Sequence, residues 1–259
     1  MRVAFDIDGV VADLQSVLVR EAEVLFGRTL TITPEVDEDH PLDGLTARGE
    51  SLAAFDRRCI PAGCVAPPSN TPGILGRRAL PPGRLAGLGA TPDFHHGLLS
   101  HRERQRLWRR IATIENFWET LEETEEGAVA RIAAVASKRR WEVLFITKRP
   151  ATAGASAQTQ TQRWLSAKGF PLPAVYVVRR SRGAIAEALG LDAVVDDQMA
   201  NCLDVVADSH ARPLLLCRHA APSGTAVRAG PAVTRPAPVT LVRSITECLD
   251  VLEAMDSEV

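Results

Sequence analysis

Residues 3–13 read Val-Ala-Phe-Asp-Ile-Asp-Gly-Val-Val-Ala-Asp. Apolar residues at alternate positions predict a short strand over residues 2–8. The strand ends in Asp6 and Asp8, Gly9 allows a tight turn, and a helix is expected to follow. Acids at a strand end beside a helix start lie where open α/β sheets bind ligands. Because two such close carboxylates repel each other unless a proton or a cation intervenes, the pair indicates a hard metal ion.

Two further apolar runs end in polar side chains. Residues 141–147 (WEVLFIT) have strand length and end on Thr147, and residues 193–197 (AVVDD) end in Asp196 and Asp197. Continuous apolar runs of this length are typical of buried parallel strands. Taken singly, a terminal Thr often reflects β-propensity and adjacent acids often cap a helix. Three such strand ends in order favour a shared site at one edge of a sheet.

From about residue 128 onward, expected helices and strands alternate. This alternation predicts a doubly wound parallel sheet of the α/β class, with helices on both faces. The strand over residues 2–8 joins this sheet from far away in sequence, which leaves residues 15–127 as an insertion. The expected elements are helices at 129–136, through 164–165, 183–189, 201–207 and 245–252, and strands at 141–147, 175–178, 193–196 and 213–217.

The insertion is uneven in composition. Residues 61–92 hold seven prolines and six glycines, which predicts a long mobile loop because so few apolar side chains cannot offset its ordering entropy. Residues 98–121 are expected to be helical, with Ser100 and Glu103 as a capping box. Five arginines surround Trp108 there. They indicate either a phosphate or nucleic-acid patch or, as we favour, a solvated helix face. A second Ala/Pro/Gly-rich segment, 220–238, is expected to be a surface excursion.

Composition limits the function classes. The chain has 259 residues, of which 46% are hydrophobic and 24% charged, and its net charge is −2. This balance gives no bulk argument for binding a nucleic-acid polymer or a membrane. No 18-residue apolar run is present, and the chain is expected to lack a membrane span and a signal peptide. The five cysteines are odd in number and lack metal-like spacing, so a reduced, cytoplasmic protein is expected.

The opening Asp-x-Asp-Gly resembles the first signature of the haloacid dehalogenase superfamily. This resemblance implies that Asp6 is a nucleophile that takes a phosphoryl group and that Asp8 is the acid/base. Asp8 also favours a phosphatase or phosphomutase, because dehalogenases lack an acid there. Thr147 matches the second signature and is implied to bind a phosphoryl oxygen. The 193–197 stretch is similar to the fourth signature, which completes a magnesium site.

The third signature is a cation before the Asp-Asp strand, normally Lys. Here Arg182 is the best match, in the sequence Ser-Arg-Gly-Ala, and this is a departure from the family pattern. Arg keeps the charge and offers a two-pronged fork to phosphate, but its reach differs from that of Lys. Arg179, Arg180 and Lys168 are alternatives for this role.

A narrower resemblance joins both ends of the insertion to the core. Leu107-Trp108, Phe117-Trp118 and Glu126-Gly127-Ala128 look like the cap-to-core junction of the 5′(3′)-deoxyribonucleotidases. In that family cap aromatics enclose the nucleobase. The resemblance therefore implies a helical cap and a substrate wall, for which a buried packing role is the alternative. The wall would be built from Trp108, Phe117 and Trp118.

Together the resemblances imply a Mg²⁺-dependent phosphomonoester hydrolase that acts on a small phosphorylated substrate, with a nucleoside monophosphate favoured. The magnesium ligands would be Asp6, the backbone carbonyl of Asp8, and one or both of Asp196 and Asp197. Alternatives are another phosphate ester, a phosphotransferase, or a binding protein without turnover. Supporting roles are expected for four residues: Lys148 and Arg149 at the substrate or the rim, Asn201 behind the acidic loop, and Asp13 as a cap or loop-orienting residue.

Overall fold

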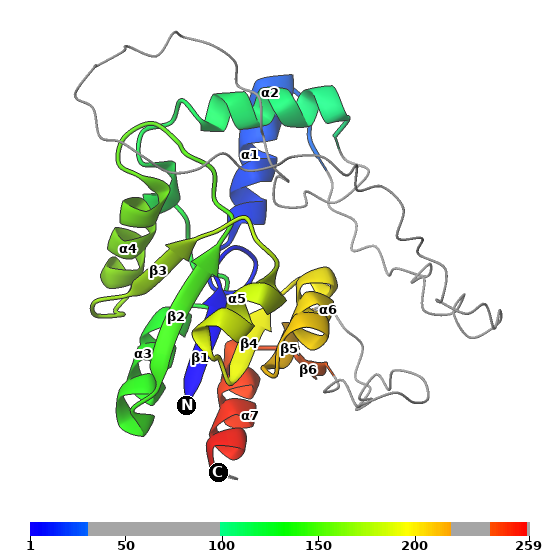
Figure 1. The fold of residues 1–259 in the computed structure, drawn as a ribbon. Helices are drawn as coiled ribbons and strands as arrows, with labels where there is room; N and C mark the ends of the chain where they lie inside the picture. The colour runs from blue at the N-terminus through cyan, green and yellow to red at the C-terminus, as the bar shows by residue number, and fades with distance from the viewer. Residues whose placement is uncertain (31–98, 219–238, 258–259) are drawn as a thin grey trace, which may run out of the picture. The chain divides into compact units, whose positions relative to one another are not determined.

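The computed structural model describes residues 1–30, 99–218 and 239–257 (Figure 1). The described residues all belong to one compact unit, which holds every element named here. Its strands are β1 (Arg2–Asp6), β2 (Glu142–Thr147), β3 (Ala174–Val177), β4 (Ala193–Asp196), β5 (Arg212–Leu216) and β6 (Thr240–Val242). Its helices are α1 (Leu14–Phe26), α2 (His101–Ile111), the 3-10 turn η1 (Phe117–Glu119), α3 (Ala128–Arg139), α4 (Ala157–Ala167), α5 (Arg182–Leu189), α6 (Met199–Asp208) and α7 (Ile245–Ser257).

The six strands form one sheet in the order β3-β2-β1-β4-β5-β6, and every neighbouring pair is parallel. The chain builds outward from β1 to β3, returns to β4 on the other side of β1, and continues to β6. The strand order therefore reverses between β1 and β4. In open α/β sheets ligands bind at the carboxyl ends of the strands beside such a reversal. The predicted doubly wound parallel sheet is confirmed.

Alternate residues of β1, β2 and β4 enter two separate cores. Val3 and Phe5 of β1 and Phe145 of β2 lie in one cluster with buried residues of α3, α4 and α7. Ala4 and Ile146 face the other way and pack with residues of α5 and α6. Both faces are apolar because helices cover both, as a parallel sheet requires. The sheet is consequently a rigid support for the side chains at its carboxyl edge.

Helices α1 and α2 belong to the first of these cores. Leu14 and Leu18 of α1 are buried in the same cluster as Leu107 and Ile111 of α2. The predicted capping box is confirmed: the Ser100 side chain accepts from the Glu103 backbone N–H, and the Glu103 carboxylate accepts from the Ser100 backbone N–H. Asp13 caps α1 by accepting from the Ser16 backbone N–H at 3.1 Å.

The first strand is shorter than the sequence pattern predicts. β1 ends at Asp6, because the Ile7 carbonyl accepts from the backbone N–H groups of Val11 and Ala12 in a tight turn. A carbonyl used in this way cannot continue the ladder. Asp8 therefore lies in the turn, and α1 begins only at Leu14.

The predicted helical stretch 98–121 is also shorter in the structure. Helix α2 ends at Ile111, and the chain reaches η1 only after Asn116, whose φ of 50° is left-handed. A left-handed residue cannot belong to a right-handed helix. Asn116 instead uses its side-chain oxygen to accept the Ala155 backbone N–H at 2.9 Å, which ties the turn to the segment after β2.

The insertion expected over residues 15–127 is described only at its two ends. The Pro/Gly-rich segment 61–92 and the segment 220–238 lie outside the described residues. Among the helices of residues 1–30, 99–218 and 239–257, none is long and apolar enough to cross a bilayer.

Gly183 should be intolerant of a side chain, because α5 and α6 approach each other at this residue. A Cβ there would lie 2.0 Å from the Asp204 carbonyl oxygen, which is backbone and cannot turn away. We expect Gly183→Ala to lower the free energy of unfolding by about 3 kcal/mol, as overpacking does. Urea unfolding measures this loss.

Gly27→Ala is the matched control. Its φ of +65° strains any side chain, but no atom lies within 4 Å of the added Cβ, so a loss of about 1 kcal/mol is expected. Equal losses in the two variants would contradict the close packing of α5 on α6.

Candidate functional site

Three strand ends bring the predicted residues to one edge of the sheet. Asp6 is the last residue of β1, Thr147 the last of β2 and Asp196 the last of β4. The register pairs Phe5 with Val195, so Asp196 lies level with Asp6 on one side, and it pairs Asp6 with Ile146, so Thr147 lies one residue further along on the other side. All three side chains are buried. This edge is the point at which the strand order reverses.

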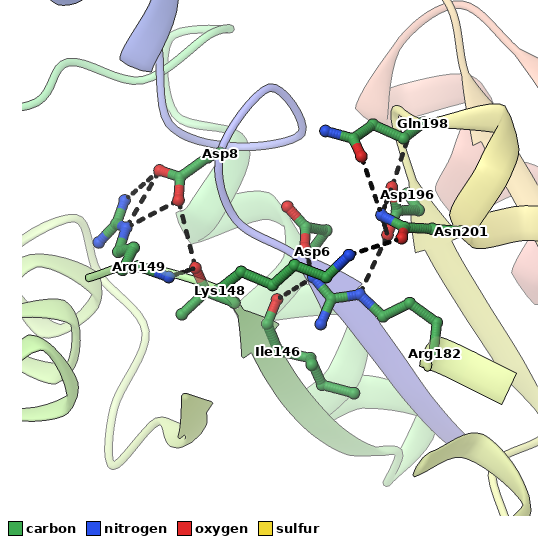
Figure 2. Close-up of polar contacts among 10 residues, drawn as sticks. Asp6, Asp8, Ile146, Lys148, Arg149, Arg182, Asp196, Gln198 and Asn201 are labelled. Carbon is green, nitrogen blue, oxygen red and sulfur yellow. Dashed lines mark hydrogen bonds and ion pairs between the residues drawn. The ribbon is translucent and has the colours of Figure 1, made fainter. Parts of the chain in front are cut away.

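Arg182 is the cation that reaches Asp6. It is the first residue of α5, and its buried guanidinium forms an ion pair with Asp6 through Nη2 and donates from Nε to Asp196 Oδ2 at 3.3 Å (Figure 2). Among the alternatives, Lys168 instead pairs with Glu122 on the surface. The Arg182 Nη1 group is buried and has no hydrogen-bond partner among the described residues. Nη1 is therefore the part of the guanidinium whose hydrogen-bonding capacity is unused.

Asp196 is already fully engaged by neighbouring donors. Besides Arg182, it accepts from the Gln198 backbone N–H at 2.9 Å and from Asn201 Nδ2 at 2.9 and 3.0 Å. Asn201 in turn accepts from Lys148 Nζ at 3.0 Å, as Figure 2 shows. The support expected from Asn201 is therefore a direct contact with Asp196. Lys148 brings a second cation to the same acids.

Asp197 keeps coordinating capacity that Asp196 has lost. Its carboxylate lies against the Cα of Gly9, where a Cβ would sit 1.9 Å from Asp197 Oδ2. Gly9 has a φ of +87°, so both the backbone conformation and the close approach require glycine. Asp197 Oδ1 is buried and has no hydrogen-bond partner within the described part of the chain. Of the two adjacent acids, Asp197 is therefore the better candidate to bind a cation directly.

The acids hold their protons more tightly than usual. Burial, followed by repulsion from Asp196, raises the pKa of Asp6 well above its ordinary value, while Arg182 opposes the rise. The same two causes raise the pKa of Asp197 to about 7. Burial is the larger cause, and repulsion among the neighbouring acids adds to it. A further cation would relieve the repulsion.

This donor set fits Mg²⁺, which prefers carboxylate and carbonyl oxygens. The orphaned Asp197 Oδ1 is the observation that supports the fit. In residues 1–30, 99–218 and 239–257, however, no three His, Cys, Asp or Glu side chains converge as a metal-binding group. The reason is that Asp6 and Asp196 face Arg182, while Asp8 faces Arg149. The ion itself stays a prediction.

Asp8 is held by an arginine to which the sequence pattern assigns no such role. Arg149 follows Thr147 by two residues and was expected at the substrate or the rim, yet its side chain is 0% exposed. Its Nη2 donates to Asp8 Oδ1 at 2.7 Å, and Thr147 Oγ1 donates to Asp8 Oδ2 at 3.2 Å. The Thr147 hydroxyl therefore contacts the acid/base candidate. Its implied contact with a phosphoryl oxygen stays a prediction.

The three aromatic residues proposed for a substrate wall are buried. Trp108, Phe117 and Trp118 are at most 5% exposed. Trp118 lies between the other two, with ring centroids 6.4 Å from Trp108 and 4.9 Å from Phe117, and its face covers the Arg149 guanidinium at 4.7 Å. This arrangement favours the packing alternative, and contact with a substrate stays a prediction.

Arg218 is a further residue that sequence reasoning missed. It lies just beyond β5 and donates to the carbonyl oxygens of Gly9 at 2.6 Å and Val10 at 2.7 Å. Glu125 pairs with it at 3.1 Å and also accepts from the Ile245 backbone N–H. Arg218 thus fixes the turn that carries Asp8. No sequence signal marks it, because the turn that it holds lies more than 200 residues away along the chain.

Comparison with known proteins adds little to this geometry. No protein-family model and no curated protein matches the chain. A candidate beta-phosphoglucomutase from Thermotoga maritima superposes with a TM-score of 0.45 at 17% identity, covering 98% of this chain and 99% of that one. A haloacid dehalogenase-like family hydrolase from Xanthomonas campestris gives 0.42 at 15% identity, covering 100% and 96%. Similarity at this level shows neither the family nor the function of this chain.

The raised pKa of Asp197 predicts a pH-dependent stability in the absence of divalent cations. The folded protein keeps this proton up to a pKa of about 7, whereas the unfolded chain releases it near the ordinary aspartate pKa of 3.8. Stability from this group is therefore present at low pH and is lost as the pH rises from about 4 to 7.

Asp197→Asn removes the titrating group. Between about pH 4 and pH 7 the unfolding free energy of this variant should therefore fall less than that of the wild type. At pH 8 the variant should exceed the wild type by about 1–2 kcal/mol, less than the full shift because the site relaxes. Urea unfolding in a chelator at pH 5 and pH 8 measures both values. Parallel pH dependences in the two proteins would contradict the buried, repelled carboxylate.

Proposed function

We propose that this protein is a Mg²⁺-dependent phosphomonoester hydrolase that works through an aspartyl-phosphate on Asp6. The observation that carries the proposal is the pairing of Asp6 with Arg182 at the carboxyl edge of the sheet. Arg182 presents a buried N–H group without a partner beside a carboxylate that can attack. A phosphoryl group bound there would lie between a nucleophile and a cation. The resemblance of the opening signature supports the same chemistry.

The chemistry divides into two displacements. First, a carboxylate oxygen of Asp6 attacks phosphorus, the bond from phosphorus to the leaving oxygen breaks, and Asp8 gives that oxygen a proton. Water then attacks phosphorus and loses a proton to Asp8. The bond from phosphorus to Asp6 breaks, which releases inorganic phosphate and restores the carboxylate. Two acids with separate partners suit these two roles.

The remaining side chains either neutralise the charge of the phosphoryl group or hold the residues that do so. Arg182 and Lys148 place positive charge beside the phosphoryl oxygens, where it stabilises the negative charge of the transition state. Asn201 and Gln198 hold Asp196, which keeps Arg182 in place. Asp6, the backbone carbonyl of Asp8, and Asp197 would hold Mg²⁺. When bound, the ion supplies further charge neutralisation.

The substrate is proposed to be a small phosphate ester, with a nucleoside monophosphate favoured by the resemblance at residues 107–128. Another phosphate ester, or transfer of the phosphoryl group to an acceptor other than water, would use the same residues. Initial rates over nucleotides, sugar phosphates and a generic aryl phosphate, each with and without Mg²⁺, distinguish these substrates. Absence of turnover on every ester in both conditions would leave a phosphate-binding protein instead.

Asp6→Asn should abolish hydrolysis while leaving the fold intact, because the replacement is nearly isosteric and an amide is a poor nucleophile. Phosphate release from an aryl phosphate measures turnover, and circular dichroism checks the fold. Full turnover by a folded Asp6→Asn variant would exclude the covalent mechanism.

Arg182→Ala should lower kcat/KM by at least about 100-fold, since a donor aimed at developing charge contributes on that scale. Arg182→Lys keeps the charge without the fork and should recover part of the loss. The same steady-state assay measures both variants. A mild effect of Arg182→Ala would transfer the phosphate-binding role to Lys148.

A further inference from the structure

We infer that Arg149 is a positioning residue that acts through Asp8, fixing the orientation of the carboxylate that moves protons in the two displacements. The inference rests on the proposed function and adds to it a residue outside the four signatures. Arg149 does not reach the substrate itself, because its side chain is 0% exposed. Its effect on the reaction must therefore pass through the groups that it contacts.

The contact with Asp8 is a two-pronged fork. Arg149 Nε lies 3.0 Å from both Asp8 carboxylate oxygens, and Nη2 lies 2.7 Å from Oδ1. Thr147 Oγ1 donates to Asp8 Oδ2 and is the third donor to this carboxylate. Figure 2 shows the Asp8 carboxylate turned toward Arg149 and away from Arg182. Planar fork-to-carboxylate pairing fixes direction as well as distance. The carboxylate cannot rotate without losing at least one of these bonds.

Arg149 is itself held from several sides. Its Nη1 donates to Thr161 Oγ1 at 2.9 Å, and its backbone N–H donates to Thr147 Oγ1 at 3.2 Å. The guanidinium lies over the rings of Trp118 at 4.7 Å and Trp164 at 6.0 Å. Cation–π contacts of this kind strengthen when water is excluded. Arg149 is thus a fixed group to which Asp8 is attached.

Stability alone does not explain this arrangement. Removing Arg and Asp from water costs free energy that their attraction often fails to recover, and apolar residues of similar volume can be as stable. Fully satisfied buried polar networks do, however, specify one geometry. Here the geometry that is specified is that of the acid/base candidate.

The pair also connects Asp8 to the end of the insertion. Trp118 belongs to η1, and it is anchored by donation from its ring Nε1 to the Pro150 carbonyl at 3.0 Å and from its backbone N–H to Gln160 at 3.0 Å. Trp118, which the family resemblance implies to be part of a substrate wall, therefore packs against Arg149 and supports it. Arg149 therefore joins three segments: the turn after β1 through Asp8, the end of β2 through Thr147, and η1 through Trp118.

Arg149→Lys tests the inference, because Lys keeps the charge but offers a single point instead of a fork. We expect kcat to fall by about 100-fold, the scale of proton-transfer catalysis, with little change in KM. The fall in kcat/KM, which reports only the steps through the first displacement, should be larger for an alkyl phosphate, whose leaving oxygen needs a proton, than for a nitrophenyl phosphate. Damage to the fold alone would lower kcat/KM equally for the two substrates, and that result overturns the inference.

A double-mutant cycle supplies the second test. In the Asp8→Asn background, Arg149→Lys should cause no further loss of kcat, because the group through which it acts is already gone. If the double variant instead loses kcat by the product of the two single-variant factors, the inference is overturned. If Arg149→Lys does not fold, Thr161→Val replaces it: loss of the hydroxyl loosens the fork, and a several-fold fall in kcat that disappears in Asp8→Asn is expected.

Arg163→Met is the matched control. Arg163 belongs to α4, the helix that also carries Thr161. Its side chain is exposed and pairs with Glu119 at 3.3 Å on the surface, so unchanged kcat is expected. Absence of hydrolysis by the wild-type protein would overturn the proposed function and this inference together. Hydrolysis by the wild type with an equal loss of kcat/KM for both substrates in Arg149→Lys would overturn the inference alone.

Discussion

The buried guanidinium of Arg182 between Asp6 and Asp196 is the interaction on which the rest of the site depends. Two carboxylates at the ends of neighbouring parallel strands repel each other in a region from which water is excluded. The positive charge of Arg182 offsets this repulsion. Asn201 and the Gln198 backbone N–H donate further hydrogen bonds to Asp196. Because β1 and β4 flank the reversal in strand order, the sheet itself forces this approach. The charge arrangement is therefore a consequence of topology.

A second arginine serves the other acid, and this division gives the site its chemical asymmetry. Asp6 shares Arg182 with Asp196, whereas Asp8 has Arg149 to itself. Neighbouring carboxylates with different environments can take different roles, one as nucleophile and one as proton carrier. Asp197 has an oxygen that accepts no hydrogen bond from any described residue, so it is the acid best able to accept a further cation. Each acid is thus distinguished by its partner rather than by its own chemistry.

Much of this could be predicted from sequence, because strand ends and periodicity are local signals. The parallel sheet, the capping box at Ser100 and the convergence of Asp6 with Asp196 all follow from such patterns. The pairing of Arg149 with Asp8 could not be predicted, since it joins residues 141 positions apart and depends on side-chain rotamers. For Trp118 the sequence left a substrate wall and a buried packing role as alternatives, because burial also depends on contacts between distant segments. Family signatures mark residues that act on the substrate and leave out those that hold them.

The most direct test of this account is to locate the phosphoryl group on the protein. In an Asp8→Asn variant given an activated aryl phosphate, the first displacement needs little acid while the second lacks its base, so the intermediate should accumulate. Acid quenching, proteolysis and peptide mass spectrometry should then find one phosphoryl group on Asp6. Turnover by the wild type with no phosphoryl group on Asp6 in this variant, or with one on a different residue, would contradict the account.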